Sequence, residues 1–409
     1  MKVMSFLGTG NYQSTTYCYG IQECTTHLFP HAVTRFVAPD ELLVCLTPGA
    51  KITIPQGQTQ THFEHLCALH QREGLVPPLP VDIPNGSSTA ELWDMFTILA
   101  QQLSPGDDVV FDITHGFRSL PMLIILAAAY LRVAKQVTLR AILYGAFEAK
   151  DAASNRTPVF ELSPFLSLLD WTTATEQFLQ TGNAQALAER LHQAAPRTKA
   201  LTDHLEGIAQ GLHLLRPLDV MRRAAEVPER IKAATPTITR TAPPFTTLLE
   251  RISVDYGRFG LHDPVRPANA PQFLLRLLDL AEWYLAKEQI AHALAIAREW
   301  LPTLLCYRFR LDVLDREARE AMEALLGEET MRQITVRGHI CQWANVPHGA
   351  RLRHLWGEPT RLASLRNDVL HAGFRKRPQS AREIIKQTTA ILTELRTLAQ
   401  LWNLEGRTL

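Results

Sequence analysis

A chain of 409 residues is long enough to form two or three domains around large cores. Its formal net charge of +1 gives no strong overall preference for a polyanionic partner. No Cys-x-x-Cys pair and no signal peptide is present, and the longest apolar run, residues 123–133, is too short to span a bilayer. We therefore expect a reduced, cytoplasmic protein with no membrane span and no bound metal.

The N-terminal third alternates predicted strands with predicted helices. Strands are expected at residues 2–7, 34–37, 41–46, 81–83, 108–112 and 137–144, and helices at residues 61–72, 89–103 and 120–131. Ser88 precedes the second of these helices as an N-cap, with Glu91 at the spacing of a capping box. This alternation predicts a mostly parallel, doubly wound α/β sheet, whose ligands bind beyond the carboxyl ends of the strands where the strand order reverses.

A polar, glycine-containing loop follows the first predicted strand. It consists of Gly8, Thr9, Gly10 and Asn11. Backbone N–H groups in such a loop can approach an anion closely, because glycine has no side chain. The loop is neither a GxGxxG fingerprint nor a phosphate-binding P-loop. Taken by itself, it fits a plain tight turn better than a ligand site.

A second polar loop follows the strand that ends at Asp112. Thr114 and the backbone near Gly116 can donate hydrogen bonds to phosphate or ribose oxygens. Arg118 can pair with a phosphate, and His115 can form a hydrogen bond or stack on a base. Asp112 can orient the loop, cap the following turn or accept from a ribose hydroxyl. Because both loops follow strands, we expect them at one edge of the sheet and in one site.

The second loop and the start of the chain resemble a known family. DITHGFRSLP, residues 112–121, resembles the Asp-x-Thr-His-Gly motif of the CARF proteins of type III CRISPR systems, and KVMSFLGTGNY resembles the beginning of those proteins. The resemblance implies a Rossmann-like sheet that senses a cyclic oligoadenylate. It also implies a homodimer in which two copies of these loops enclose the two-fold symmetric ring. By family habit we favour cyclic tetra-adenylate, and we expect no other cofactor.

The middle of the chain is predicted to be helical. Helices are expected from residue 160 to Gly182 and over residues 184–194, 198–215 and 218–234, with breaks at Thr235–Pro236 and at residues 241–244. These patterns are most simply a helical core. A DNA-reading helix-turn-helix is the alternative, because some CARF proteins carry a winged helix, although we find no convincing wing hairpin. The prolines between Pro264 and Pro271 mark the clearest boundary.

The C-terminal part is predicted to be an all-α bundle. Helices are expected over residues 271–301 with a bend, and over residues 311–326, 362–371 and 380–402. Residues 331–409 hold 13 Lys/Arg against 5 Asp/Glu, which gives this segment a net charge of +8. A basic segment fits RNA or DNA as a partner, and it fits a solvated helical surface equally well.

One short helix of this bundle carries residues suited to RNA cleavage. Asn367 and His371 are four residues apart and share a helical face, with Arg366 at its side. RNA supplies its own nucleophile, the 2′-hydroxyl, so that His371 can act as general base or acid and Arg366 can stabilise charge on the phosphate. Asn367 can position the phosphate or His371. The basic residues just beyond can hold the RNA backbone: Arg375, Lys376 and Arg377.

This spacing alone is weak evidence for a ribonuclease. Arg-Asn-x-x-x-His late in an all-α domain, however, resembles the HEPN ribonuclease motif. CARF followed by HEPN is the architecture of the type III CRISPR accessory ribonucleases. The resemblance implies a metal-independent endoribonuclease for single-stranded RNA, activated by a cyclic oligoadenylate, whose site combines two copies of Arg366, Asn367 and His371. We expect three domains: a Rossmann-like CARF domain over residues 1–165, a helical linker domain over 166–265 and a HEPN bundle over 266–409.

Two other functional classes remain open from the sequence. A ligand-responsive transcription regulator would bind duplex DNA through the helical middle and would not cleave RNA. A dinucleotide-dependent enzyme would use the N-terminal sheet, but the GxGxxG glycines are missing. Ring size, RNA sequence preference and assembly beyond a dimer are not encoded in these motifs, nor is degradation of the ring by its own sensor.

Overall fold

The chain divides into two compact units, Met1–Asp170 and Trp171–Leu409. The computed structural model describes residues 1–116, 120–241, 243, 245–328, 330–357, 362–374 and 378–405. The first unit is an α/β sheet, and the described part of the second is helical apart from one short hairpin. The predicted fold class is confirmed. The division of the helical part near residue 265 stays a prediction, and one apolar core runs through both of its halves.

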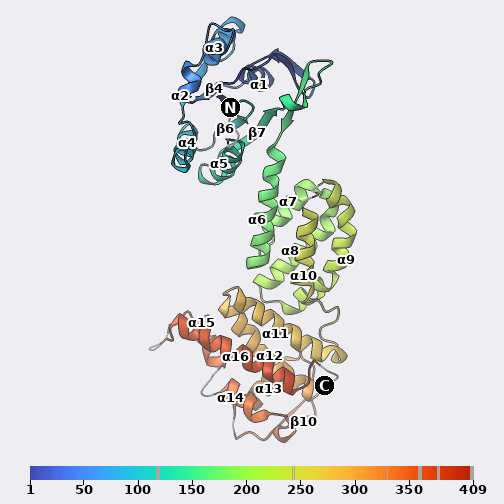
Figure 1. Ribbon diagram of the computed structural model, residues 1–409. Helices are drawn as coiled ribbons and strands as arrows, with labels where there is room; N and C mark the ends of the chain where they lie inside the picture. The colour runs from blue at the N-terminus through green and yellow to red at the C-terminus, as the bar shows by residue number, and fades with distance from the viewer. Residues whose placement is uncertain are drawn as a thin grey trace. The chain divides into compact units, whose positions relative to one another are not determined.

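An eight-stranded sheet forms the first unit, in the order β3-β2-β8-β7-β6-β1-β4-β5. Figure 1 labels β4, β6 and β7 of this sheet and the helices that pack around it. All neighbouring strands are parallel except the pairs β2–β3 and β7–β8. β1 lies between β6 and β4, so that the strand order reverses beside β1, where a ligand is expected. The strands are β1 (Lys2–Leu7), β2 (Thr15–Tyr19), β3 (Gln22–Thr26), β4 (Glu41–Leu46), β5 (Pro78–Asp82), β6 (Asp108–Asp112), β7 (Thr138–Gly145) and β8 (Arg156–Glu161).

Helices cover both faces of this sheet because its central strands are apolar on both sides. In β1, Val3 and Leu7 belong to the core on one face, and Met4 and Phe6 belong to the core on the other. The first core contains side chains from α1 (Phe29–Val37), α2 (Pro48–Ile52) and α3 (His62–Glu73), and the second contains side chains from α4 (Thr89–Gln101) and α5 (Leu120–Ala134). This is the doubly wound arrangement predicted from the sequence.

Residues 34–37 were predicted to be a strand, and this prediction is wrong. They form the last turn of α1, which has Pro30 in its first turn and ends at Ala38 in the left-handed conformation. Seven of its nine residues are buried, so that tertiary burial decides the conformation of this β-prone stretch. The hairpin of β2 and β3, which turns at Gly20 with φ of 60°, and strand β8 were not predicted.

The second unit consists of packed helices and one antiparallel hairpin, β9 (Gln333–Val336) with β10 (His339–Gln342). No helix in the described ranges is both long enough and apolar enough to cross a membrane. The helices are α6 (Leu166–Thr181), which begins in the first unit, α7 (Gln185–Ala194), α8 (Lys199–His213), α9 (Pro217–Thr241), α10 (Phe245–Gly257), α11 (Ala270–Ala286), α12 (Ile290–Arg308), α13 (Arg316–Gly327), α14 (Gly349–Trp356), α15 (Leu362–Leu370) and α16 (Ala381–Leu401).

The predicted break at Thr235–Pro236 is wrong, because α9 continues through both Pro228 and Pro236. Its buried side chains, among them Val220, Val227 and Ile238, recur at helical spacing and belong to the core, which offsets the hydrogen bonds lost at the prolines. The predicted helix over residues 271–301 is instead two helices, α11 and α12, and Glu288 between them has φ of 57°. The described residues between α6 and residue 262 contain no strand, and hence no wing hairpin.

Buried tyrosines link the two halves of the second unit. The Tyr284 hydroxyl of α11 donates to the Leu212 carbonyl of α8 over 2.6 Å. The Tyr256 hydroxyl donates to the Phe178 carbonyl, and its ring stacks on Phe178 with centroids 4.3 Å apart. Ring contacts of Tyr256 with Trp283 extend this cluster to α11. These contacts join α6, α8 and α10 to the C-terminal helices.

Tyr284→Phe should lower the free energy of unfolding of the second unit by about 1 kcal/mol, because it removes a buried hydrogen bond and leaves the ring in place. Urea unfolding followed by tryptophan fluorescence measures this, since all tryptophans except Trp93 lie in the second unit. Tyr307→Phe is the matched control, because the Tyr307 hydroxyl is 3.5 Å from its acceptor. Equal effects of the two substitutions would contradict the role given to Tyr284.

Candidate functional site

The loop after β1 is closed by the side chain of Tyr12. The Gly8 N–H donates to the Tyr12 hydroxyl over 2.8 Å. A Cβ atom at Gly8 would lie 3.2 Å from that hydroxyl and 3.3 Å from the His115 carbonyl oxygen, so that a larger residue fits poorly. The first loop is thereby held against the second, as expected for loops of one site.

Asp112 anchors the second loop from inside the sheet. Its carboxylate is fully buried, accepts from the Ser5 hydroxyl of β1, and accepts from the Thr114 N–H over 2.8 Å. Thr114 in turn accepts with its hydroxyl from the Gly145 N–H at the end of β7, over 2.9 Å. These bonds tie β1, β6 and β7 together directly beneath the loop. Asp112 thus orients the loop, one of the roles left open by the sequence.

The ring of Tyr12 stacks on two histidines. Its centroid is 3.8 Å from that of His115 and 4.3 Å from that of His62, and both ring pairs are nearly parallel. His115 Nε2 accepts from the Phe29 N–H over 3.1 Å, so that this imidazole holds the start of α1. His62 Nε2 donates to the Gly10 carbonyl over 2.7 Å, which fixes the first loop from the start of α3.

A pocket of about 480 Å³ opens where these loops meet, at the carboxyl ends of β1, β4 and β6. Among the predicted ligand residues, it is lined by Gly8, Thr9, Gly10, Thr114, His115 and Gly116. Asn11 lines a smaller neighbouring pocket of about 210 Å³ together with Thr114, His115 and Tyr144. Asp112 lines neither pocket, and Arg118 lies outside the described residues.

The sequence did not single out several residues of this site. Thr47, Gly49 and Asn85 line the larger pocket from the loops after β4 and β5, and Tyr12 and His62 shape the first loop. They are single residues in separate segments without a shared spacing, so that only the fold brings them together. The position after a parallel strand is the one signal that points to Thr47 and Asn85.

Burial disfavours the charged forms of the titratable groups of this site. Burial raises the pKa of Asp112 to about 6, against the opposing effect of its hydrogen bonds. Burial lowers the pKa of His115 to about 3, and the neighbouring His62 and His27 lower it further. Burial also lowers the pKa of His62. Since no Lys or Arg of the described chain lines the larger pocket, neutral hydroxyl, imidazole and backbone groups form its polar surface.

The second candidate site lies on α15. The Arg366 Nη1 donates to the Asn367 side-chain oxygen over 2.9 Å, and Arg366 Nε is buried with no hydrogen-bond partner in the described part of the chain. The His371 N–H donates to the Asn367 carbonyl over 2.9 Å, so that the helical turn extends to His371. The His371 side chain is exposed. α15 thus carries a guanidinium bonded to an amide, and an accessible imidazole follows one residue after its end.

α15 is fixed by buried side chains on its other face. Leu362 and Leu365 belong to the core of the second unit, and Asp368 is buried as well. Leu370 is 48% exposed, because it lies at the end of the helix beyond the last packed turn. Arg375, Lys376 and Arg377 lie outside the described residues. Within the described ranges, no three His, Cys, Asp or Glu side chains are grouped so as to hold a metal ion.

Part of the chain is similar to a CRISPR-associated protein. Residues 167–262 match the family model of the second domain of the CRISPR-associated protein MJ1674. Over the segments that they cover, these matches agree with the resemblance to CRISPR-associated proteins found in the sequence. The family match falls on the helical middle, where neither motif lies.

A curated relative is the CRISPR-associated protein MJ1674 of Methanocaldococcus jannaschii itself. It is 28% identical over 131 residues, which are 31% of this chain and 20% of that protein, so that the match spans about a fifth of the relative's length. Among solved structures, Csm6 of Enterococcus italicus bound to cyclic hexa-2′-fluoro-hexa-dAMP covers 97% of this chain and 93% of its own, with a TM-score of 0.46 and 11% identity.

Because the Asp112 carboxyl is buried, we predict that the difference in free energy of unfolding between Asp112→Asn and the wild type depends on pH. Since its pKa is raised in the folded state, its contribution to the free energy of unfolding falls as the pH rises from about 4 to about 6. Asp112→Asn removes this loss. The free energy of unfolding of the variant minus that of the wild type should therefore increase by about 2 kcal/mol between pH 4 and pH 7.

Urea unfolding followed by far-UV circular dichroism at each pH gives this difference. Asp108→Asn, at the other end of β6, is the control, because hydrogen bonding to Arg140 lowers the pKa of that exposed carboxyl and its contribution changes only below about pH 4. If the free energy of unfolding of Asp112→Asn minus that of the wild type does not vary between pH 4 and pH 7, the pKa of the Asp112 carboxyl is not raised by burial.

Proposed function

We propose that this protein is a cyclic-oligoadenylate-activated endoribonuclease of type III CRISPR defence. The observation that carries the ribonuclease proposal is the arrangement on α15, where Asn367 orients the guanidinium of Arg366 and the imidazole of His371 is open to a large substrate. The pocket between the loops after β1 and β6 supports a ligand-sensing role for the first unit. Relatedness to CRISPR-associated proteins supports the biological setting.

The proposed reaction uses the 2′-hydroxyl of the RNA as nucleophile. The hydroxyl attacks the adjacent phosphorus and the 5′-oxygen of the next nucleotide leaves, which gives a 2′,3′-cyclic phosphate and a 5′-hydroxyl. His371 serves as proton acceptor or donor, and Arg366 stabilises the negative charge that develops on the phosphate oxygens. Asn367 holds the guanidinium in place. This chemistry needs no metal ion, and two copies of the motif in a dimer would supply both the acid and the base.

The proposed ligand is a cyclic oligoadenylate, with cyclic tetra-adenylate as the first choice. Hydroxyl and backbone groups of Thr9, Thr114 and Gly116 are suited to ribose and phosphate oxygens, and the Tyr12–His115 stack keeps the two loops in register. Ring binding would favour the conformation in which the ribonuclease site is complete. The proposal assigns no dinucleotide chemistry to this pocket.

We place the dimer contact of the first unit on α5. Met122, Leu126, Tyr130 and Val133 are between 55% and 84% exposed and lie three or four residues apart, so that they form one apolar stripe along the helix. A second copy of the stripe is the proposed occupant, because α5 begins shortly after Gly116. Pairing of two such helices would bring two ligand loops near one axis, as a two-fold symmetric ring requires.

Leu126→Asp should shift the protein from dimer towards monomer in sedimentation velocity, since a charge in an apolar contact is unpaired. The folded monomer should persist, because Leu126 is exposed in the single chain. Ile52→Asp, which adds the same charge at an exposed apolar residue of α2, should leave the dimer intact. An unchanged dimer in Leu126→Asp would exclude α5 as the contact.

The ribonuclease proposal is tested with a fluorophore–quencher RNA in the presence of EDTA, without ligand and with cyclic tetra-adenylate or cyclic hexa-adenylate. One ring should switch cleavage on in the wild type. His371→Ala and Arg366→Ala should each reduce the cleavage rate by about a hundredfold or more, because each removes a group acting on the transition state.

The exposed histidine of β10 supplies the control, since His339→Ala should cleave like the wild type. Full activity of either α15 variant would remove those residues from the reaction. Absence of cleavage with every ring would contradict the ribonuclease proposal itself.

A further inference from the structure

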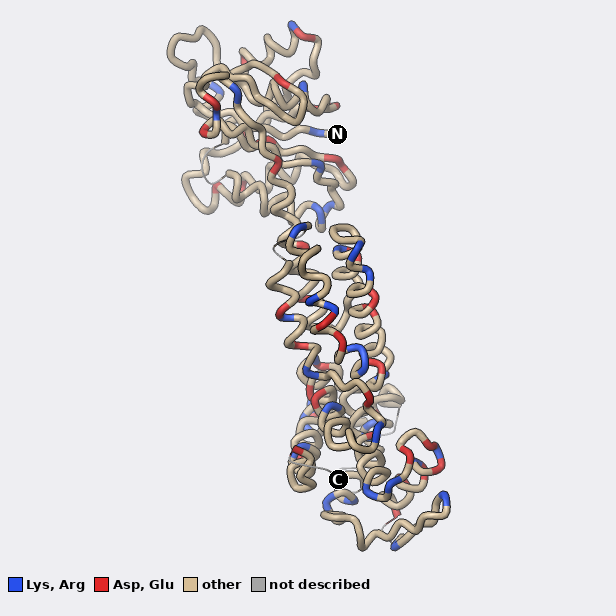
Figure 2. The backbone as a smooth tube through the Cα atoms, turned by 90° about the vertical axis from the view of Figure 1, so that its right-hand side faces the viewer, with Lys and Arg blue, Asp and Glu red and all other residues tan. Residues whose placement is uncertain are grey.

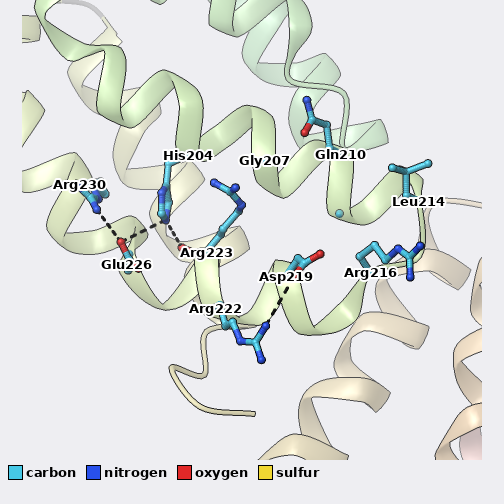
Figure 3. Close-up of a pocket in the computed structure, with 11 residues that line it drawn as sticks. His204, Gly207, Gln210, Leu214, Arg216, Asp219, Arg222, Arg223, Glu226 and Arg230 are labelled. Carbon is cyan, nitrogen blue, oxygen red and sulfur yellow. Dashed lines mark hydrogen bonds and ion pairs between the residues drawn. The ribbon is translucent and has the colours of Figure 1, made fainter. Parts of the chain in front are cut away.

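A basic pocket of about 660 Å³ lies between α8 and α9, apart from both sites described above (Figure 3). Four arginines line it, together with two carboxylates. The pocket lies within the segment that matches the second domain of MJ1674, where neither sequence motif falls. The lining arginines are Arg216, Arg222, Arg223 and Arg230.

Two glycines of α8 form the floor of this pocket. A Cβ atom at Gly207 would lie 2.3 Å from Cζ of Arg223, so that this guanidinium rests directly on the bare backbone of α8. A Cβ atom at Gly211 would lie 2.8 Å from Val220 Cγ2. Glycine inside a helix lowers the stability of that helix by about 1 kcal/mol relative to alanine. At these two positions the close approach of α9 offsets this loss. Figure 3 shows the Arg223 side chain extending from α9 to Gly207.

The charges of the pocket are only partly compensated. Glu226 pairs with Arg230 at 2.8 Å, and Asp219 lies 3.9 Å from Arg222. Arg216 and Arg223 have no carboxylate within ion-pair distance in the described part of the chain. Elsewhere along the helices of this unit, Lys and Arg are interspersed with Asp and Glu (Figure 2). Two free guanidinium groups in one concave site are therefore a local feature and not a consequence of net charge.

The lining indicates the chemistry of the ligand. A guanidinium matches the geometry of phosphate oxygens and stays charged at every physiological pH. No Phe, Tyr or Trp side chain lines the pocket, and Leu214 is its one large apolar residue. The imidazole of His204 is buried and donates to the Arg223 carbonyl, so that it offers little surface for base stacking. Sites that enclose a whole nucleotide are mostly apolar. The pocket is thus suited to phosphate groups and not to bases.

We propose that this pocket binds the phosphodiester backbone of single-stranded RNA through Arg216 and Arg223. The assignment of RNA rests on the proposed ribonuclease function, since it names a second contact for the same substrate outside α15. Arg216 precedes α9 and Arg223 lies in its second turn, about 10 Å further along the helix axis, so that the two guanidinium groups contact two phosphates of one strand. Contacts of this kind hold RNA without reading its sequence.

The test is fluorescence anisotropy of a labelled 20-nucleotide RNA of mixed sequence with the full chain carrying His371→Ala, which prevents cleavage. Adding Arg216→Ala and Arg223→Ala should weaken binding on the order of tenfold at low salt. The slope of log Kd against log salt should fall by about 1.4, roughly 0.7 for each lost phosphate contact to a single strand.

Two further variants separate the pocket from general charge. Arg251→Ala with Arg316→Ala removes the same charge from exposed arginines paired with Asp255 and Glu320, and should leave the affinity within about twofold of the parent. Gly207→Ala keeps every charge and favours the helix, but its methyl group displaces Arg223, so that affinity should fall by a few-fold.

Equal affinity of the pocket variant and the matched control would overturn the proposal, as would absence of RNA binding by the parent. Calorimetry with cyclic tetra-adenylate completes the test. If the pocket variant loses ring binding but keeps RNA binding, the pocket binds a small ligand, and the proposal is also overturned. These outcomes are independent of cleavage. Arginine-dependent RNA binding without ring-activated cleavage would support the pocket and contradict the proposed function. Ring-activated cleavage without arginine-dependent RNA binding would support the proposed function and contradict the pocket.

Discussion

The first unit depends on a carboxylate buried at the centre of its sheet. Asp112 ends β6, accepts from Ser5 of β1 and from the Thr114 N–H, and Thr114 extends the network to Gly145 of β7. A buried carboxyl is costly unless it is hydrogen-bonded, so that the network holds only in this geometry. The polar loop is therefore positioned from below by Asp112 and Ser5, which line neither pocket described at its edge. Its hydroxyl and backbone groups remain available to a ligand.

The sequence predicted the parts of the fold that follow from local pattern. Apolar runs followed by polar loops gave β1, β4 and β6, and the Ser88 cap at the start of α4 is present, although Glu91 accepts from Ser87 and not from Ser88. The predictions that were wrong concern segments whose conformation depends on tertiary contacts. Residues 34–37 are helical because α1 is buried, and α9 continues through two prolines because its apolar face is buried. Tyr12 and His62 are part of the candidate site through stacking across three segments, which no local spacing encodes.

The three candidate sites differ in the charge and burial of the groups that they would offer to the phosphates of the proposed ligands. The pocket at the sheet edge offers neutral groups whose imidazoles stay uncharged because burial lowers their pKa. α15 offers one guanidinium bonded to Asn367, followed by the exposed imidazole of His371; these groups would suit the transient charge of the proposed cleavage. The α8–α9 pocket offers two guanidinium groups without an ion-pair partner and has no Phe, Tyr or Trp in its lining, which would suit salt-dependent attachment of an RNA chain. The proposed sensor, ribonuclease and RNA-holding sites would make different demands on charge, and the three sites differ in charge accordingly.

The most direct test of the account is whether the first unit controls cleavage in the second. A Cβ atom at Gly116 would lie 2.3 Å from the buried Leu120 side chain, so that Gly116→Ala displaces the ligand loop without touching α15. RNA cleavage is measured against the concentration of the activating ring, and ring affinity is measured by calorimetry. The account predicts that half-maximal cleavage shifts to higher ring concentration by the same factor as the Kd, with an unchanged rate at saturation. Weaker ring binding with no shift in the activation curve would contradict it.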